Sequence, residues 1–187
     1  MKTFIIILCL LSQVSIAVSQ DVKTKKELRK EASLKKKEAK EAKLQQQFKA
    51  TETLLNSRNF VLNANTKTTH SGLQRDADGG LNFISVNSDN IVTQTGSNSG
   101  KGYNDIGGVT LKGKITKWDL LKNDKNKSFN LHLEITSDLG GWPYDINIDV
   151  SADGRSSVTI GGSKLFDGNL VERDYAHIYT GDSYFVY

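Results

Sequence analysis

The side chains that could bind a metal or transfer protons are three histidines and a pair of carboxylates that lie close to each other in the sequence. His70, His132 and His177 lie far apart, and none stands at metal-ligand spacing from another histidine or from a carboxylate. Asp145 and Asp149 alternate with apolar residues. On one extended strand they lie about 13 Å apart, too far for the carboxylate pair of a glycosidase unless the strand bends. We therefore expect no metal and no cofactor.

Other reactive groups also lack the surroundings that catalysis requires. The serines show no nucleophile-elbow context. The loop from Gly96 to Asp105 is followed by neither a helix nor the Lys-Ser/Thr pair of a phosphate-binding loop. Cys9 is the only cysteine and lies in an expected leader, so the mature chain would have no disulfide, thiolate ligand or cysteine nucleophile. The sequence predicts that the protein is not an enzyme.

The beginning of the chain, residues 1–19, has the order of a secretory signal peptide. Lys2 precedes an apolar run from Phe4 to Leu11, and the small residues Ala17–Ser19 follow. We expect cleavage after Ser19, which gives a mature chain that begins at Gln20. The apolar run is shorter than the ~20 residues of a spanning helix, so we expect no transmembrane segment after the signal is removed.

Residues 20–55 form a charged segment that favours a helix. From Asp21 to Lys43 ten Lys or Arg stand against five Asp or Glu, a net charge of +5. Leu44–Tyr187 has fourteen against sixteen, a net charge of −2. The basic pI therefore belongs to this segment, and we expect no nucleic-acid partner for the folded body. Lys23–Lys49 contains no Gly or Pro and is rich in helix-forming residues.

The apolar residues divide this segment into two parts. Leu44, Phe48, Thr51 and Leu55 share one helical face, so we expect the last three turns to dock on the body and the earlier part to extend into solvent. Two interpretations of the earlier part remain open: a solvated spacer, which we favour, and an electrostatic contact with an anionic membrane surface or partner. The second lacks the apolar face that a membrane-lying helix needs.

From residue 56 to 187 the composition changes to β-branched, aromatic and turn residues, which predicts antiparallel strands. The clearest strand is Ile106–Trp118, because Val109, Leu111 and Ile115 alternate with polar residues. Gly113 lies on the same face, where it permits a bend or bulge. The other expected strands include Phe60–Asn65, Leu81–Asn87, Asn90–Thr95, Phe129–Ile135, Tyr144–Val150, Val158–Ile160 and a last one at His177–Tyr179, with Thr68–Gly80 as a loop.

The alternation also predicts the register of a first hairpin, because residues that face each other must point to the same side. A three-residue loop at Asp124–Asn126 places Ile115 opposite Ile135. The same register places Trp118 opposite His132, which gives this histidine a structural role across from an aromatic ring.

A second hairpin is predicted in the same way. Even-numbered residues from Tyr144 to Val150 point inward, as do Val158 and Ile160. Only a three-residue loop at Ala152–Gly154, with glycine in the left-handed conformation, keeps these residues on one face. This register pairs Ile148 with Val158.

About eight short antiparallel strands joined by tight turns indicate a small barrel or sandwich. Several segments recur in this order in one family of exported bacterial proteins. They are Arg58–Leu62, Asn82–Asn87, Ile106–Thr110 with Gly113, and Ser151–Gly154 with Lys164-Leu165 and Gly168. Over roughly Leu54–Gly181 the chain therefore resembles the domain-of-unknown-function family 4251.

The resemblance implies a mainly β fold, an antiparallel lipocalin-like barrel or half-open barrel of about eight strands behind an N-terminal charged helix. It also implies a signal peptide and a periplasmic or outer-envelope location. It implies no activity and supplies no catalytic residues.

Three classes of function remain open. A small barrel would bind an apolar ligand at its mouth, with Tyr103, Trp142 and Tyr144 as rim candidates, although we favour Trp142 as a plug of the barrel end. An envelope interaction module would hold one partner through the basic helix and another through the β domain. An outer-membrane barrel is disfavoured, because the strands are short and no aromatic girdles are present.

We therefore predict an exported, non-enzymatic interaction or structural module of the cell envelope. The alternative is a lipocalin-like binder of a small apolar ligand in the periplasm.

Overall fold

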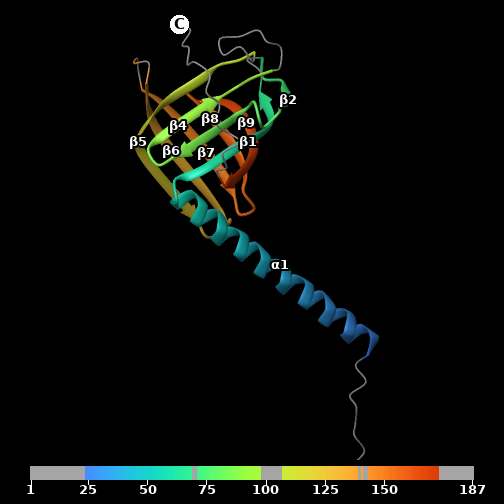
Figure 1. Cartoon of the computed structure of the whole chain (residues 1–187). Helices are drawn as coiled ribbons and strands as arrows, with labels where there is room; N and C mark the ends of the chain where they lie inside the picture. The colour runs from blue at the N-terminus through green and yellow to red at the C-terminus, as the bar shows by residue number, and fades with distance from the viewer. Residues whose placement is uncertain (1–23, 69–70, 98–106, 139, 141–142, 173–187) are drawn as a thin grey trace, which may run out of the picture. The chain divides into compact units, whose positions relative to one another are not determined.

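A computed structural model describes residues 24–68, 71–97, 107–138, 140 and 143–172 of the chain (Figure 1). The expected signal peptide and the expected strand at His177–Tyr179 lie outside these ranges. Within them, no helix is long and apolar enough to cross a membrane. The elements are α1 (Lys25–Asn56), β1 (Asn59–Thr68), β2 (Gln74–Asp76), β3 (Phe83–Asn87), β4 (Asn90–Gln94), β5 (Thr110–Asn123), β6 (Ser128–Ser137), β7 (Tyr144–Ser151), β8 (Arg155–Ile160) and β9 (Ser163–Glu172).

Eight strands close into an antiparallel barrel, as the sequence predicts. Their order around the wall is β1-β3-β4-β5-β6-β7-β8-β9, and β9 pairs again with β1. The ninth strand, β2, is short and pairs with the end of β1 at Thr66–Thr68. The expectation of a loop over Thr68–Gly80 is thus wrong for Gln74–Asp76, because three polar residues give no alternating pattern to reveal a strand.

Apolar side chains from all eight barrel strands fill the interior, because alternate residues on each strand point inward. Phe60, Phe129 and Phe166 are each at most 2 % exposed. The cluster also contains two residues of α1. Its other members include Leu62, Ile84, Val86, Ile91, Ile115, Leu131, Leu133, Ile135, Ile146, Ile148, Val150, Val158 and Leu170. The interior is therefore a packed core.

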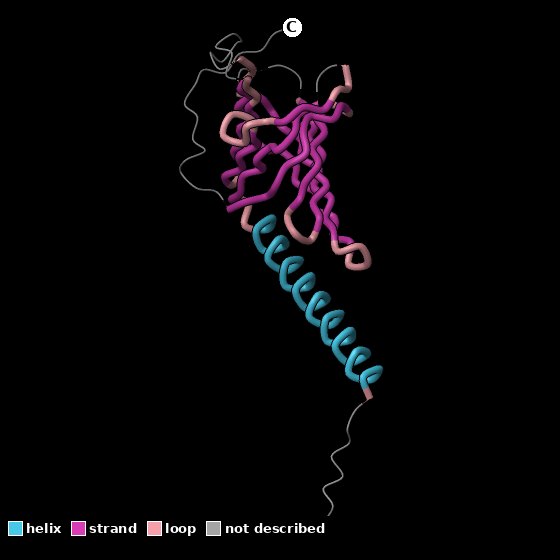
Figure 2. The backbone as a smooth tube through the Cα atoms, turned by 90° about the vertical axis from the view of Figure 1, so that its right-hand side faces the viewer, coloured by secondary structure: helices cyan, strands magenta, loops and turns pink. Residues whose placement is uncertain are grey.

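The last turns of α1 pack on one end of the barrel (Figure 2), where their buried residues are Phe48, Thr51 and Leu55. The ring of Phe48 stacks on Phe129 with 4.6 Å between centroids. The Thr51 hydroxyl donates a 2.9 Å hydrogen bond to the Ala152 carbonyl oxygen, in the loop between β7 and β8. The predicted docking is confirmed, although it begins at Phe48, since Leu44 is exposed.

The register of β5 and β6 agrees with the prediction only up to a bulge. Ile115 pairs with Ile135, as expected, but the next pair is Lys117 with Glu134. One extra residue, Thr116, shifts all later pairs by one, so Trp118 lies opposite Leu133. The predicted pairing of Trp118 with His132 and the three-residue loop are wrong, because the bulge reverses the parity of β5 and turns even-numbered residues inward.

The register of β7 and β8 agrees with the prediction throughout. Ile148 pairs with Val158, and Ala152–Gly154 forms the three-residue loop. Gly154 has φ +83°, the left-handed conformation that favours glycine.

Gly168 allows the barrel to close. It lies on β9 opposite Ala64 of β1, next to an irregularity in the register of the two strands. A Cβ atom at this position would overlap the backbone carbonyl of Asn63. The seam between the first and last strands therefore requires the absence of a side chain here.

Candidate binding groove on the barrel wall

Of the three predicted rim residues, the structure describes one. Tyr103 and Trp142 lie outside the described residues. Tyr144 is the first residue of β7 and is partly buried against the core. Its hydroxyl is buried and finds no hydrogen-bond partner among the described residues. Burial, followed by the charge of Asp138, raises the pKa of Tyr144 to about 12. The phenol is therefore neutral at physiological pH.

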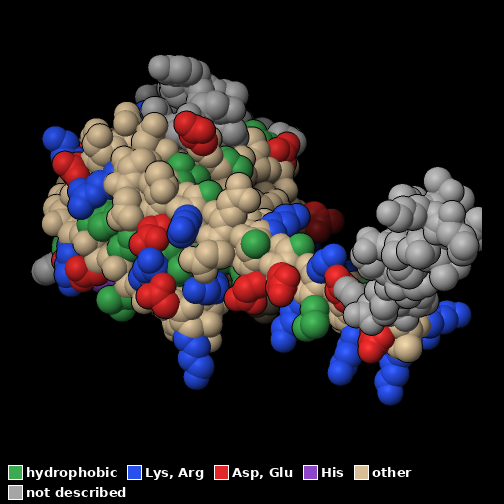
Figure 3. Space-filling view, turned by 90° about the horizontal axis from the view of Figure 1, so that it is seen from below, with side chains coloured by type: hydrophobic (Ala, Val, Ile, Leu, Met, Phe, Trp, Pro, Cys, Tyr) green, Lys and Arg blue, Asp and Glu red, His purple; other side chains and the backbone are tan. Residues whose placement is uncertain are grey.

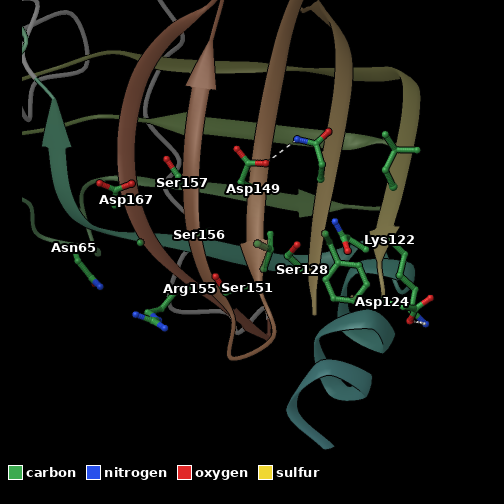
Figure 4. A pocket seen from close by; sticks show the side chains of 16 residues that line it. Asn65, Lys122, Asp124, Ser128, Asp149, Ser151, Arg155, Ser156, Ser157 and Asp167 are labelled. Carbon is green, nitrogen blue, oxygen red and sulfur yellow. Dashed lines mark hydrogen bonds and ion pairs between the residues drawn. The ribbon is translucent and has the colours of Figure 1, made fainter. Parts of the chain in front are cut away.

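A groove of about 1010 Å³ lies elsewhere, with its lining drawn mainly from β5 to β9 (Figure 4). Its lining is rich in polar residues from the outward positions of these strands. Residues that pair across neighbouring strands lie about 5 Å apart. Outward side chains at paired positions therefore form a row across the outer surface of the barrel.

The groove lining includes a row of four polar side chains, one from each of β6, β7, β8 and β9. The register pairs Asn130 with Asp149, Asp149 with Ser157, and Ser157 with Asp167. Figure 4 shows the last three side by side. The row thus presents an amide, a carboxylate, a hydroxyl and a second carboxylate.

Hydrogen bonds hold both carboxylates of this row. The Asn130 side-chain amide donates to Asp149 Oδ1 at 2.8 Å. Asp167 Oδ2 accepts from Gln74 Nε2 at 2.7 Å and lies 2.8 Å from the Lys164 ammonium. Partial burial alone would raise the pKa of Asp167, but hydrogen bonds from Lys164, Ser157 and Gln74 outweigh it and lower the pKa. Asp167 is therefore ionised at neutral pH.

The flanks of the groove differ in chemistry. Leu121 of β5 pairs with Asn130 and is 68 % exposed, so it offers an apolar contact at one end of the row. Arg155, at the start of β8, forms an ion pair with Asp153 at 2.9 Å. Lys122 is held by Glu52 of α1 at 2.9 Å. Charges of both signs therefore surround the polar row.

This arrangement suits binding by hydrogen bonds. The row offers acceptors at the carboxylates and both donors and acceptors at the amide and hydroxyl groups. An ionised carboxylate held by three donors is a poor proton donor. Within the described residues there is no group of three or more His, Cys, Asp or Glu that could hold a metal ion.

His132 lies outside the groove lining and has neighbours of its own. Its Nδ1 is 2.9 Å from the Asn147 side-chain oxygen, and Asp119 faces it on β5. The predicted structural role therefore has different partners from those expected. His70 and His177 lie outside the described residues.

Sequence reasoning missed the groove, although one signal was available. The predicted register of β7 and β8 already placed Asp149 opposite Ser157. Asp167 lies within β9, where it completes the row. The other two pairings needed the registers of β6 with β7 and of β8 with β9.

Comparisons with known proteins agree with the fold. The family model described as Domain of unknown function (DUF4251) matches residues 42–164. This match begins within α1, ahead of the expected Leu54, and ends before the expected Gly181. No curated protein matches the chain.

A solved structure is similar over most of its length. It is the crystal structure of a DUF4251 family protein from Bacteroides eggerthii, with a TM-score of 0.53 and 25% sequence identity. The alignment covers 67% of this chain and 87% of that one.

Proposed function

The chain belongs to the DUF4251 family, whose function is unknown, and we propose that it is an exported, non-enzymatic binding module of the cell envelope. The groove on the barrel wall is its binding surface, and its ligand is polar. One observation carries the proposal: the inward positions of the barrel are filled by packed side chains, whereas polar side chains at outward positions of β6–β9 line an open groove.

The chemistry of the groove supports binding without catalysis. Asp149 accepts a hydrogen bond from Asn130, and donors hold Asp167 in its charged form. A general acid in a glycosidase instead needs a raised pKa. Ser157 lies between the two carboxylates, and among the described residues no histidine lines the groove to act as its base.

The barrel fold is also compatible with the alternative, a small apolar ligand inside. Such a ligand would have to displace inward side chains such as Phe60 and Leu62, which are fully buried. Displacement costs the packing of the core, whereas a ligand in the groove leaves the core unchanged. The packed interior therefore favours the groove.

Site-specific photo-crosslinking in cells tests the groove. A photoreactive residue at Ser157 is compared with one at Thr136, an exposed position on β6 outside the groove lining. We expect a discrete crosslinked product from Ser157 and none from Thr136, in chains whose N-terminus is Gln20. Asp149→Lys should abolish the product by placing a cation in the row.

Equal crosslinking at both positions, or none at Ser157, would reject the groove as the binding surface. Recovery of the protein in the cytosolic fraction with residues 1–19 still attached would contradict export.

A further inference from the structure

The first part of α1, Lys25–Ala39, is a helix that its own sequence specifies. Thr24 and Glu27 form a capping box: the Thr24 backbone N–H donates to Glu27 Oε2 at 2.7 Å, and the Glu27 N–H donates to Thr24 Oγ1 at 3.3 Å. Apart from Glu31, every side chain in this part is exposed. Its residues are therefore available to a partner.

Positive and negative charges lie on different faces of this helix. At about 100° per residue, six of its seven basic residues fall within an arc of about 140°, and its three acidic residues fall within about 40° on the other side. The basic residues are Lys25, Lys26, Arg29, Lys30, Lys36 and Lys37, and the acidic ones are Glu27, Glu31 and Glu38. We call the first set the basic face. Figure 3 shows several Lys and Arg side chains along one edge of the helix.

This separation is unfavourable for a helix that is only a spacer. A spacer gains stability when Glu and Lys alternate at i,i+4 positions, whereas like charges at that spacing destabilise it. The basic face contains two such like-charge pairs, Lys25 with Arg29 and Lys26 with Lys30. Lys35, which lies off the face, forms the favourable i,i+4 pair with Glu31 at 3.3 Å. The pattern concentrates positive charge at the expense of helix stability.

We propose that the basic face binds a membrane surface through anionic lipid headgroups. Six positive charges on one face complement a layer of phosphates, and each such charge near an anionic membrane strengthens binding on the order of fivefold. The helix lies on the headgroups without insertion, because its remaining residues provide no broad apolar face. Residues 24–39 also contain no aromatic side chain on which a nucleic-acid base could stack. This proposal adds a second partner, the membrane, to that of the groove.

The test uses the full mature chain and a variant that rearranges charge without changing it. K30E/E31K/K37E/E38K exchanges neighbouring residues, so net charge and composition stay the same and the capping box is intact. The basic face falls from six positive charges to four, with two negative charges among them. Binding is measured by co-sedimentation with vesicles of phosphatidylcholine and phosphatidylglycerol in equal amounts.

We expect the parent chain to bind these vesicles and the rearranged variant to bind at least tenfold more weakly, with unchanged helix content by circular dichroism. Lys35→Gln, which removes a charge off the basic face, should change binding by less than about twofold. Binding of the parent should fall as salt is raised.

Three results would overturn the proposal. They are no binding of the parent to the anionic vesicles, equal binding of parent and rearranged variant, and tighter binding to a DNA duplex than to the vesicles.

Discussion

The two sides of the barrel wall use the same strands for opposite purposes. On β6, Phe129 and Leu131 are almost fully buried in the core, while Asn130 between them is partly exposed and lines the groove. On β7, Ile148 and Val150 flank Asp149 in the same way. On the proposed function, alternate residues of one strand therefore serve stability and binding. Substitutions one residue apart should therefore have separable effects.

The largest separation is expected between Phe129 and its neighbour. Phe129→Ala removes a ring that stacks on Phe48 and leaves a cavity, so the free energy of unfolding should fall by about 3–5 kcal/mol. Asn130→Ala should change it by about 0.5 kcal/mol or less, since the side chain is on the outer surface. Denaturant unfolding measures both. Equal losses would break the division between the two sides.

The seam of the wall gives the next effect. Gly168→Ala forces a methyl group against the Asn63 carbonyl and should cost about 1–3 kcal/mol. In the control Gly80→Ala, the new Cβ meets only the Asp78 carboxylate at 3.3 Å, the end of a movable side chain, and little should change. If Gly168→Ala leaves the temperature of thermal unfolding unchanged, β1 and β9 separate easily, which would contradict the close approach at this seam.

The hydrogen bond that holds α1 on the end of the barrel should contribute less to stability. Thr51→Val keeps the size of the side chain but leaves the Ala152 carbonyl without its hydrogen bond, so stability should fall by about 1–2 kcal/mol. Thr53→Val is the matched control, because Thr53 is exposed on the same helix. Chemical denaturation compares the two variants. Equal values would mean that the buried contact adds nothing to docking.

The smallest effect concerns acid stability at the groove. The pKa of Asp167 is lowered in the folded protein, so its contribution is present above the ordinary value of 3.8 and is lost as the pH falls through the lowered value. The carboxylate is about a third exposed, so the contribution is small. Asp167→Asn should flatten this part of the curve of melting temperature against pH. An unchanged curve below pH 3.8 would contradict the hydrogen-bonded state of Asp167.

Much of the wall could be predicted from sequence, because alternation reports directly which residues point inward. The loop at Ala152–Gly154 and the pair Ile148–Val158 followed from parity alone. The bulge at Thr116 could not be predicted in this way. Alternation shows which residues share a face, but it does not reveal that one strand contains an extra, unpaired residue. Trp118 and Leu120, both even-numbered, were the signal that the parity of β5 had changed.

The groove was harder to predict than the wall. Its row combines residues from four strands, and the pairing of Ser157 with Asp167 lies beside an irregularity between Val158 and Thr159. The predicted rim relied on aromatic residues, which sequence alone associates with ligand pockets. Tyr144 is the first residue of β7, whose other end leads into the loop Ala152–Gly154. It therefore lies about 23 Å along the strand from the end of the barrel on which α1 packs.

The contrast between a packed interior and a binding groove on the outer wall is tested most directly by native mass spectrometry. The sample is the full chain, exported and purified from a Gram-negative periplasm. A packed interior predicts that no apolar molecule is retained with the polypeptide from Gln20 onward. A retained apolar molecule, released only when the protein unfolds, would show that the barrel interior holds a ligand and would contradict the assignment of binding to the outer groove.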